Sequence, residues 1–242
     1  MSRQAKSQWH RAGGSVIIAA ISLAGVLGNA LVAPALPDIA RALSVDDTGI
    51  GLVVAAASLP GVVVAPIIGV AADRFGRRIV VVPCLVVFGL GGIAAMAAPT
   101  FGVLIAARLL QGLGAAGLVN LAVVMIGDRH EGAVERAAAI GRNGAVLIGG
   151  LAVLPVVGGG LVALAGWRAA FAPMALTLLV ALAAARMLPR GRPAGVAGLQ
   201  DQMRAAGAAL ADRRVVAMLV IGYFAFVLVF GAVLTLLPID LD

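Results

Sequence analysis

Long apolar segments alternate with short polar segments along this chain. Seven apolar segments have 18 or more residues; they cover 14–36, 49–70, 79–98, 101–126, 143–165, 169–186 and 215–237. About 20 helical residues, at 1.5 Å each, cross the roughly 30 Å hydrocarbon core of a bilayer. The pattern therefore predicts an all-α membrane protein with about seven transmembrane helices.

The longest polar connection, at 189–214, divides the chain unequally. It carries several charged residues and separates six predicted helices from a seventh. We therefore expect a six-helix transmembrane domain at 1–188, a cytoplasmic linker at 189–214, and the first helix of an incomplete C-terminal domain at 215–242. A seventh helix without a partner makes a poor bundle, so a missing C-terminal half is an expected partner.

A short internal repeat bears on how the six helices are organised. The second span contains Pro-Ile-Ile-Gly at 66–69, and the fifth contains Pro-Val-Val-Gly at 155–158. If the six helices form two groups of three, these two helices are equivalent, as in the inverted repeats of many transporters. Two such matches can also arise by chance in a chain with 32 glycines, and both interpretations stay open.

Composition also indicates a membrane protein, and it favours lipid over nucleic acid as the partner of the positive charges. Hydrophobic residues make up 62% of the chain, charged residues 12%, and the mean hydropathy is +1.09. An ordinary soluble domain is about 45–50% apolar and about 25% charged. The net charge of +7 comes from cations between the apolar segments, where they favour anionic lipid headgroups over nucleic acid.

The cations also predict an orientation. If the N-terminus is cytoplasmic, 15 of the 18 Lys and Arg residues lie in inner segments, and the outer loops carry only Arg41 and Arg168. This is a strong positive-inside bias. It predicts a multi-pass protein of the cell membrane, with 1–13 and 189–214 inside and with 37–48 and 166–168 outside.

The connection between the second and third spans has an ordered pattern, G-x-x-x-D-R-x-G-R-R at 69–78. Gly76 allows a turn with positive φ, and Asp73 can pair with an arginine or accept from N–H groups at a helix start. A basic loop obeying the charge bias alone would explain the arginines, but not their order. The pattern resembles the signature loop of the major facilitator superfamily. The resemblance implies a conformational gate formed by Gly69, Asp73, Arg74, Gly76, Arg77 and Arg78.

Two further motifs resemble those of the superfamily's drug–proton antiporters. The fourth span contains R-x-x-Q-G-x-G-A-A at 108–116, and the fifth contains an imperfect G-x-x-x-G-P-x-x-G-G at 150–159, with Leu154 in place of a glycine. The small residues and the proline imply close packing or kinking of helices; plain packing with a kink is an equal alternative to a motif role. The residues concerned are Gly112, Gly114, Gly150, Pro155, Gly158 and Gly159.

Arg108 is the one cation within a predicted span. A charge at the bilayer centre costs about 2.5–3.5 kcal/mol or more and usually faces a protein interior or a water cavity. The alternative is that Arg108, seven residues into its span, snorkels to the outer headgroups. Asn29 and Gln111 are the polar side chains expected within its reach, whereas Asn120 lies about 120° away around the helix. We take these four residues as the candidate substrate and proton pathway.

The resemblance implies a fold and a function. The expected fold is the superfamily's N-terminal six-helix bundle, a 3+3 inverted repeat, followed by a seventh helix. The expected function is secondary active efflux of a small, drug-like amphipathic compound in exchange for protons, by alternating access. No predicted span contains Asp or Glu, so the coupling carboxylate is in a missing half, or is Asp38, or coupling differs.

Other functions stay open as alternatives. The first is that the chain is an incomplete, non-transporting half. The second is a membrane enzyme, which is disfavoured because no nucleophile–base arrangement occurs. We expect no cofactor and no metal; the expected partners are membrane lipid, a small-molecule substrate and protons.

Overall fold

A computed structural model describes residues 12–189, 207, 211–218, 220–222 and 224. The chain divides into two compact units, 1–194 and 195–242, and only the first is described at length. All regular elements in the described residues are helical, and six helices are long and apolar enough to cross a membrane. The predicted seventh span, 215–237, lies largely outside the described residues, so it stays a prediction.

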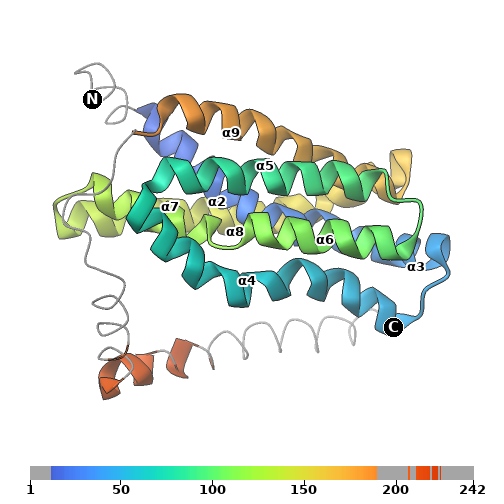
Figure 1. Ribbon diagram of the computed structural model, residues 1–242, viewed down its shortest axis with the longest axis horizontal. Helices are drawn as coiled ribbons and strands as arrows, with labels where there is room; N and C mark the ends of the chain where they lie inside the picture. Colours follow the sequence, from blue (N-terminus) through green and yellow to red (C-terminus); the bar gives the residue numbers. More distant parts are fainter. Residues whose placement is uncertain (1–11, 190–206, 208–210, 219, 223, 225–242) are drawn as a thin grey trace. The chain divides into compact units, whose positions relative to one another are not determined.

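The first unit is a bundle of helices whose axes run roughly side by side (Figure 1). Its elements, in chain order, are α2 (Ala12–Val32), η1 (Ala33–Ala35), α3 (Leu36–Leu43), α4 (Asp47–Phe75), α5 (Arg77–Met96), α6 (Phe101–Ala115), α7 (Leu118–Arg129), α8 (Ala133–Ala165), η2 (Trp167–Ala175) and α9 (Leu176–Met187). The first span is α2 with η1 and α3, the fourth is α6 with α7, and the sixth is η2 with α9. The six predicted spans of this unit are thus all present.

The polar segments are more helical than hydropathy predicted. The predicted outer segment 37–48 contains most of α3, which ends only where Ser44 adopts a left-handed φ of 53°. The Asp46 side chain then accepts a hydrogen bond from Gly49 N at 2.9 Å and caps α4. Similarly, only residues 130–132 separate α7 from α8. Hydropathy marks the edge of the membrane, but a helix continues until a capping residue ends it.

The fourth span is broken, which the apolar run at 101–126 did not predict. α6 ends at Ala115 and α7 begins at Leu118, with Gly117 between them at a φ of +88°. A Cβ on Gly117 would lie 2.9 Å from Ile68 Cγ2 of α4. Glycine is therefore required here both by the backbone conformation and by the approach of a neighbouring helix.

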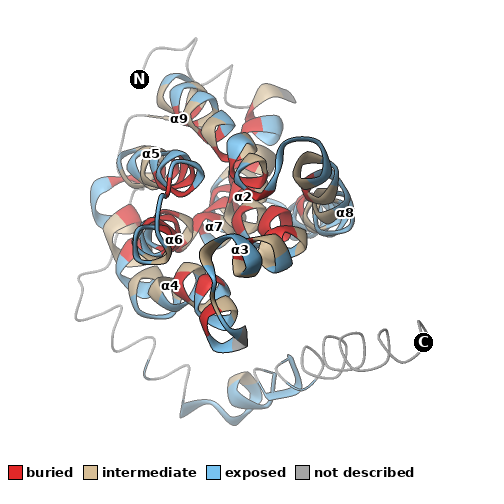
Figure 2. Ribbon diagram, turned by 90° about the vertical axis from the view of Figure 1, so that its right-hand side faces the viewer, coloured by how far each residue is buried: buried red, intermediate tan, exposed pale blue. Residues whose placement is uncertain are grey.

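The bundle buries its interior where α2, α5, α6 and α7 meet, whereas α4 and α8 expose most of their surface (Figure 2). One apolar cluster lies around Leu85, Leu118 and Leu121, and a second around Phe88 and Phe171. The first cluster includes residues of α2, α5 and α7, and the second includes residues of α2, α5 and α6.

Small residues set the closest helix contacts. A Cβ on Gly112 of α6 would lie 2.6 Å from Ala57 O of α4, and a Cβ on Gly158 of α8 would clash with the Leu31 carbonyl of α2. The fourth span thus packs on the second as the fifth packs on the first. Exchange of two three-helix groups relates these two contacts, which matches the 3+3 repeat of the expected fold.

Candidate functional site

Arg108 lies at the centre of the bundle and is completely buried, with an exposed fraction of 0%. Its Nε donates to Val53 O of α4 at 3.0 Å, and its Nη1 donates to Gly28 O of α2 at 3.2 Å and to Gln111 Oε1 at 2.9 Å. Its Nη2 donates to Asn29 Oδ1 at 2.5 Å. A guanidinium has five N–H donors, and here they join three of the six spans.

The sequence explains how this cluster is assembled. Gln111 follows Arg108 by three residues and so lies on the same face of α6. Gly28 has no side chain, and a Cβ there would lie 3.6 Å from Arg108 Nη1 and 3.2 Å from Phe88 Cε2. The second contact is tight and the first is an ordinary van der Waals distance, so a glycine at this position chiefly leaves room for the Phe88 ring beside the Arg108 cluster.

Aromatic and sulfur groups close the cluster on the side of the sixth span. The Phe171 ring centroid lies 6.0 Å from Arg108 Cζ, within the range of a cation–π contact. Gln111 Nε2 lies 2.6 Å from Met174 Sδ, so the amide is held at both ends. Arg108 is thus fixed by contacts from several elements.

The structure distinguishes the two positions predicted for the Arg108 side chain, which are the protein interior and the outer headgroup layer. The side chain lies inside the protein and does not snorkel, and Asp38 pairs with Arg41 of the same short helix. The groups that accept hydrogen bonds from Arg108 are all neutral. The charge is therefore solvated by fixed dipoles, and no carboxylate pairs with it among the described residues.

The cluster reaches the surface of the unit through Asn29. Its side chain is exposed, and Asn29 Nδ2 donates to Ser58 Oγ of α4 at 3.1 Å. A small cavity of about 20 Å³ adjoins Asn29, Arg108 and Gln111, which is enough for about one water. Asn120 is exposed on α7, beyond the break in the fourth span, and the structure does not bring it into this cluster.

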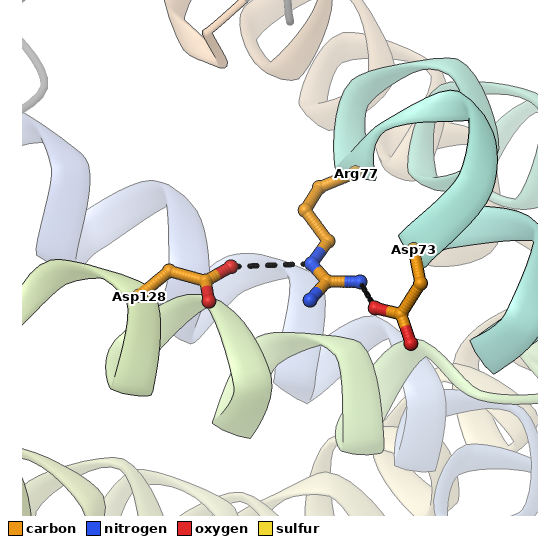
Figure 3. Close-up of polar contacts among 3 residues, drawn as sticks. All are labelled: Asp73, Arg77 and Asp128. Carbon is orange, nitrogen blue, oxygen red and sulfur yellow. Dashed lines mark hydrogen bonds and ion pairs between the residues drawn. The ribbon is translucent and has the colours of Figure 1, made fainter. Parts of the chain in front are cut away.

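A second polar cluster joins three helix ends (Figure 3). Arg77, the first residue of α5, forms an ion pair with Asp73 near the end of α4, and its Nε donates to Asp128 Oδ2 of α7 at 3.2 Å. Gly76, with a φ of +100°, makes the turn that brings Asp73 and Arg77 together. Arg74 Cζ lies 5.6 Å from the ring centroid of Phe75.

Some of the predicted site residues lie outside both clusters, and some residues of the clusters were not predicted from the sequence. A Cβ on Gly69 would meet nothing within 4 Å, so no close helix approach explains that glycine here. Asp128 was not predicted, although its position at the end of the fourth span, opposite an arginine-rich loop, was a usable signal. The carbonyls of Gly28 and Val53 have no signature in a sequence, because every residue carries one.

Comparison with known proteins identifies the family. The model of the Major Facilitator Superfamily matches residues 18–241. The chain belongs to this superfamily. Its first unit has the six-helix fold of the N-terminal half of a transporter of this superfamily.

Several relatives are named as exporters or resistance proteins. The chain is 38% identical to the puromycin resistance protein pur8 of Streptomyces alboniger over 182 residues, which are 75% of this chain and 36% of that protein. It is 34% identical to the bacillibactin exporter of Bacillus subtilis over 51% of this chain and 32% of that protein. It is 39% identical to the multidrug resistance protein Stp of Mycobacterium tuberculosis over 57% of this chain and 26% of that protein.

The chain therefore spans about a third of the length of these relatives. A solved structure supports the fold alone: a D-xylose–proton symporter matches 91% of this chain and 54% of its own, with a TM-score of 0.66 and 17% identity.

Proposed function

We propose that this superfamily member acts in the secondary active efflux of a small, drug-like amphipathic compound in exchange for protons. Transport would proceed by alternating access, in which the first unit and a second half rock about a substrate site near the middle of the membrane. We place it in the cell membrane with the N-terminus in the cytoplasm. The relatives named for puromycin, bacillibactin and multidrug export or resistance support the class of cargo.

Arg108 is the observation that carries the proposal. Its guanidinium stays charged at any accessible pH, so it is not itself the proton carrier. A fixed cation surrounded by neutral acceptors favours the ionised form of any carboxylate that approaches it. Such a carboxylate would take up its proton when it moves away, which ties protonation to conformation. Asn29 offers the route, because it connects Arg108 to the exposed surface of the unit.

The second polar cluster, which contains Asp73, Arg77 and Asp128, has a separate role in this proposal. Asp73 and Arg77 tie the ends of α4 and α5 to α7 through Asp128. All three side chains are partly exposed, at 36%, 15% and 43%, so a second half can reach them. We propose that docking of that half on Asp73 and Arg77 closes the cytoplasmic side.

An imposed pH gradient tests the proposal. The chain is reconstituted together with a second half in vesicles that contain a pH-sensitive dye, and ethidium is added as an amphipathic probe. Gradient-dependent movement of ethidium, with proton movement in the opposite direction, is the expected result. Ethidium movement that is unaffected by collapsing the gradient would contradict proton exchange.

The alternative is that this chain inserts but does not transport by itself. It is favoured by the apolar surface of α4 and α8, where Val62 is 77% and Val156 75% exposed. Lipid can cover such surface, but so can a second bundle. Normal insertion with no gradient-dependent ethidium movement, restored by supplying a second half in the same vesicles, would support this alternative.

A further inference from the structure

A cavity of about 230 Å³, separate from both polar clusters, opens between α2, α7 and α8. It is more than ten times the size of the cavity beside Arg108. The start of α2 and the connection from α7 to α8 lie at the same end of the bundle (Figure 1), which is the end that carries Arg77, because Asp128 of α7 contacts that residue. The cavity thus belongs to the arginine-rich end of the unit.

The lining of the cavity lies at the edges of the apolar runs. Its lining includes Ser15, Arg129 and Arg142. Each lies within three residues of an edge of an apolar run, since the first run begins at 14, the fourth ends at 126 and the fifth begins at 143. The lining therefore meets the bilayer where phosphate groups are found.

The charge of the cavity is positive. Arg129 and Arg142 both line it. Arg129 Nη1 donates to Ser15 Oγ at 3.1 Å, which holds that guanidinium at the start of α2. Arg142 is exposed and forms no hydrogen bond or ion pair within the part of the chain that the structure describes.

One residue of the cavity wall carries a buried acceptor. Asn143 lines the cavity and is only 6% exposed, and its Oδ1 has no hydrogen-bond partner among the residues that the structure describes. An unpaired buried acceptor costs about 1–3 kcal/mol, so a ligand that supplies an O–H here gains a specific contact. Apart from His130, the remaining wall is apolar and includes Ile18, Ile126 and Ala139. The exposed side chains of Val16 and Val146 also line it.

We propose that this cavity binds an anionic glycerophospholipid whose headgroup carries a free hydroxyl, such as phosphatidylglycerol. The phosphate lies between Arg129 and Arg142, a headgroup hydroxyl donates to Asn143 Oδ1, and the acyl chains leave past Val16 and Val146. Basic pockets between transmembrane helices are suited to such headgroups. The apolar wall is what distinguishes this lipid from a free phosphate ion. The site requires membrane insertion but not transport, so it stands independently of the proposed efflux.

Native mass spectrometry of the 242-residue chain from a neutral detergent tests the site. Phosphatidylglycerol, phosphatidylmethanol and phosphatidylcholine are added at equal concentration. Phosphatidylmethanol has the same charge as phosphatidylglycerol but no headgroup hydroxyl. One arginine near a phosphate contributes about fivefold in affinity, so phosphatidylglycerol should be retained roughly twentyfold better than phosphatidylcholine, with phosphatidylmethanol between them.

Variants separate charge from hydrogen bonding. The double variant Arg129→Gln, Arg142→Gln should lose the roughly twentyfold preference, whereas Arg142→Gln alone should lose about fivefold. Arg186→Gln is the matched control, because Arg186 is an exposed arginine in the last turn of α9 that does not line the cavity. Asn143→Leu should remove only the preference for phosphatidylglycerol over phosphatidylmethanol.

Two results would overturn the proposal. The first is an unchanged lipid preference in the double variant, with its thermal unfolding curve by circular dichroism like that of the parent. The second is displacement of phosphatidylglycerol by millimolar inorganic phosphate, since a free anion would then suffice and the acyl chains would contribute nothing. The single variant Arg142→Gln alters an exposed side chain, so it provides the comparison if the double variant does not fold.

Discussion

At the scale of single residues, the buried charge of Arg108 is stabilised by hydrogen bonds to neutral groups and not by an opposite charge. Four neutral acceptors from α2, α4 and α6 surround the guanidinium. Two of these are main-chain carbonyls, which remain in place whatever the side chains do. The arrangement solvates a permanent cation without neutralising it, so the charge remains available to act on a group that arrives.

The first prediction follows from the planar shape of that guanidinium. Arg108→Lys keeps the charge but replaces five donors in a fork with three on one nitrogen. It cannot reach Val53 O, Gly28 O and Asn29 together, so gradient-driven ethidium efflux should fall at least tenfold. Arg108→Ala should also lower the unfolding temperature, because it leaves buried acceptors without donors.

Arg186→Lys is the control for this pair, since Arg186 is exposed at the end of α9. Transport and unfolding temperature in that variant should equal those of the parent. Near-normal efflux by Arg108→Ala would reject a coupling role for the residue.

At the scale of helices, close approach depends on where glycines fall on a helix, and not on their number. Gly158 and Gly160 are two residues apart in α8. A Cβ on Gly158 would clash with Leu31, whereas a Cβ on Gly160 would meet nothing within 4 Å. Only one of them is therefore a packing position.

The second prediction uses this pair. Gly158→Ala should destabilise the unit by about 1–3 kcal/mol, since the neighbouring main chain of α2 has to move. Gly160→Ala should be neutral or stabilising by up to about 1 kcal/mol, because alanine favours a helix over glycine. Thermal unfolding in detergent measures both. Equal effects would show that α2 and α8 do not approach closely at Leu31.

The third prediction concerns the ends of α4, α5 and α7. Exposed ion pairs contribute about 0–1 kcal/mol, so Asp73→Asn and Asp128→Asn should each change the unfolding temperature little. Because both carboxylates hold the same Arg77 side chain, their effects on transport should not add. Asp73→Asn should impair efflux more than insertion.

A double-mutant cycle on the efflux rate measures this coupling. Glu135→Gln is the control, because Glu135 is an exposed carboxylate in the first turn of α8 and lies outside the cluster of Asp73, Arg77 and Asp128. Strictly additive losses for Asp73→Asn and Asp128→Asn would argue that Arg77 does not link the two helix ends.

The helices also show what could be predicted from the sequence. Six apolar runs located six spans, and the spacing of Arg108 and Gln111 placed two site residues on one face. Asn29 was expected near them because it holds an inner position in the first span. The break at Gly117 was missed, because a single glycine in a Gly-rich run gives no sign that its φ is positive. Asp128 was missed because its contact with Arg77 joins helices that are far apart in the sequence.

At the scale of the whole molecule, the positive-inside bias makes the last prediction. If the N-terminus is cytoplasmic, the connection between α3 and α4 faces outside, and the connection between α7 and α8 faces inside. The cost of moving arginine-rich loops across a membrane makes the opposite orientation unfavourable.

Cysteines placed at Val45 and at Glu131, in a Cys84→Ser background, report the two sides of the membrane. Both positions lie next to helix ends, and Glu131 is exposed. In intact cells an impermeant maleimide should label Val45→Cys but not Glu131→Cys, and in inverted vesicles the order should reverse. The Cys84→Ser background alone should remain unlabelled. Labelling of Val45→Cys only in inverted vesicles would reverse the topology and would place the Arg77 cluster and the lipid cavity on the outer side.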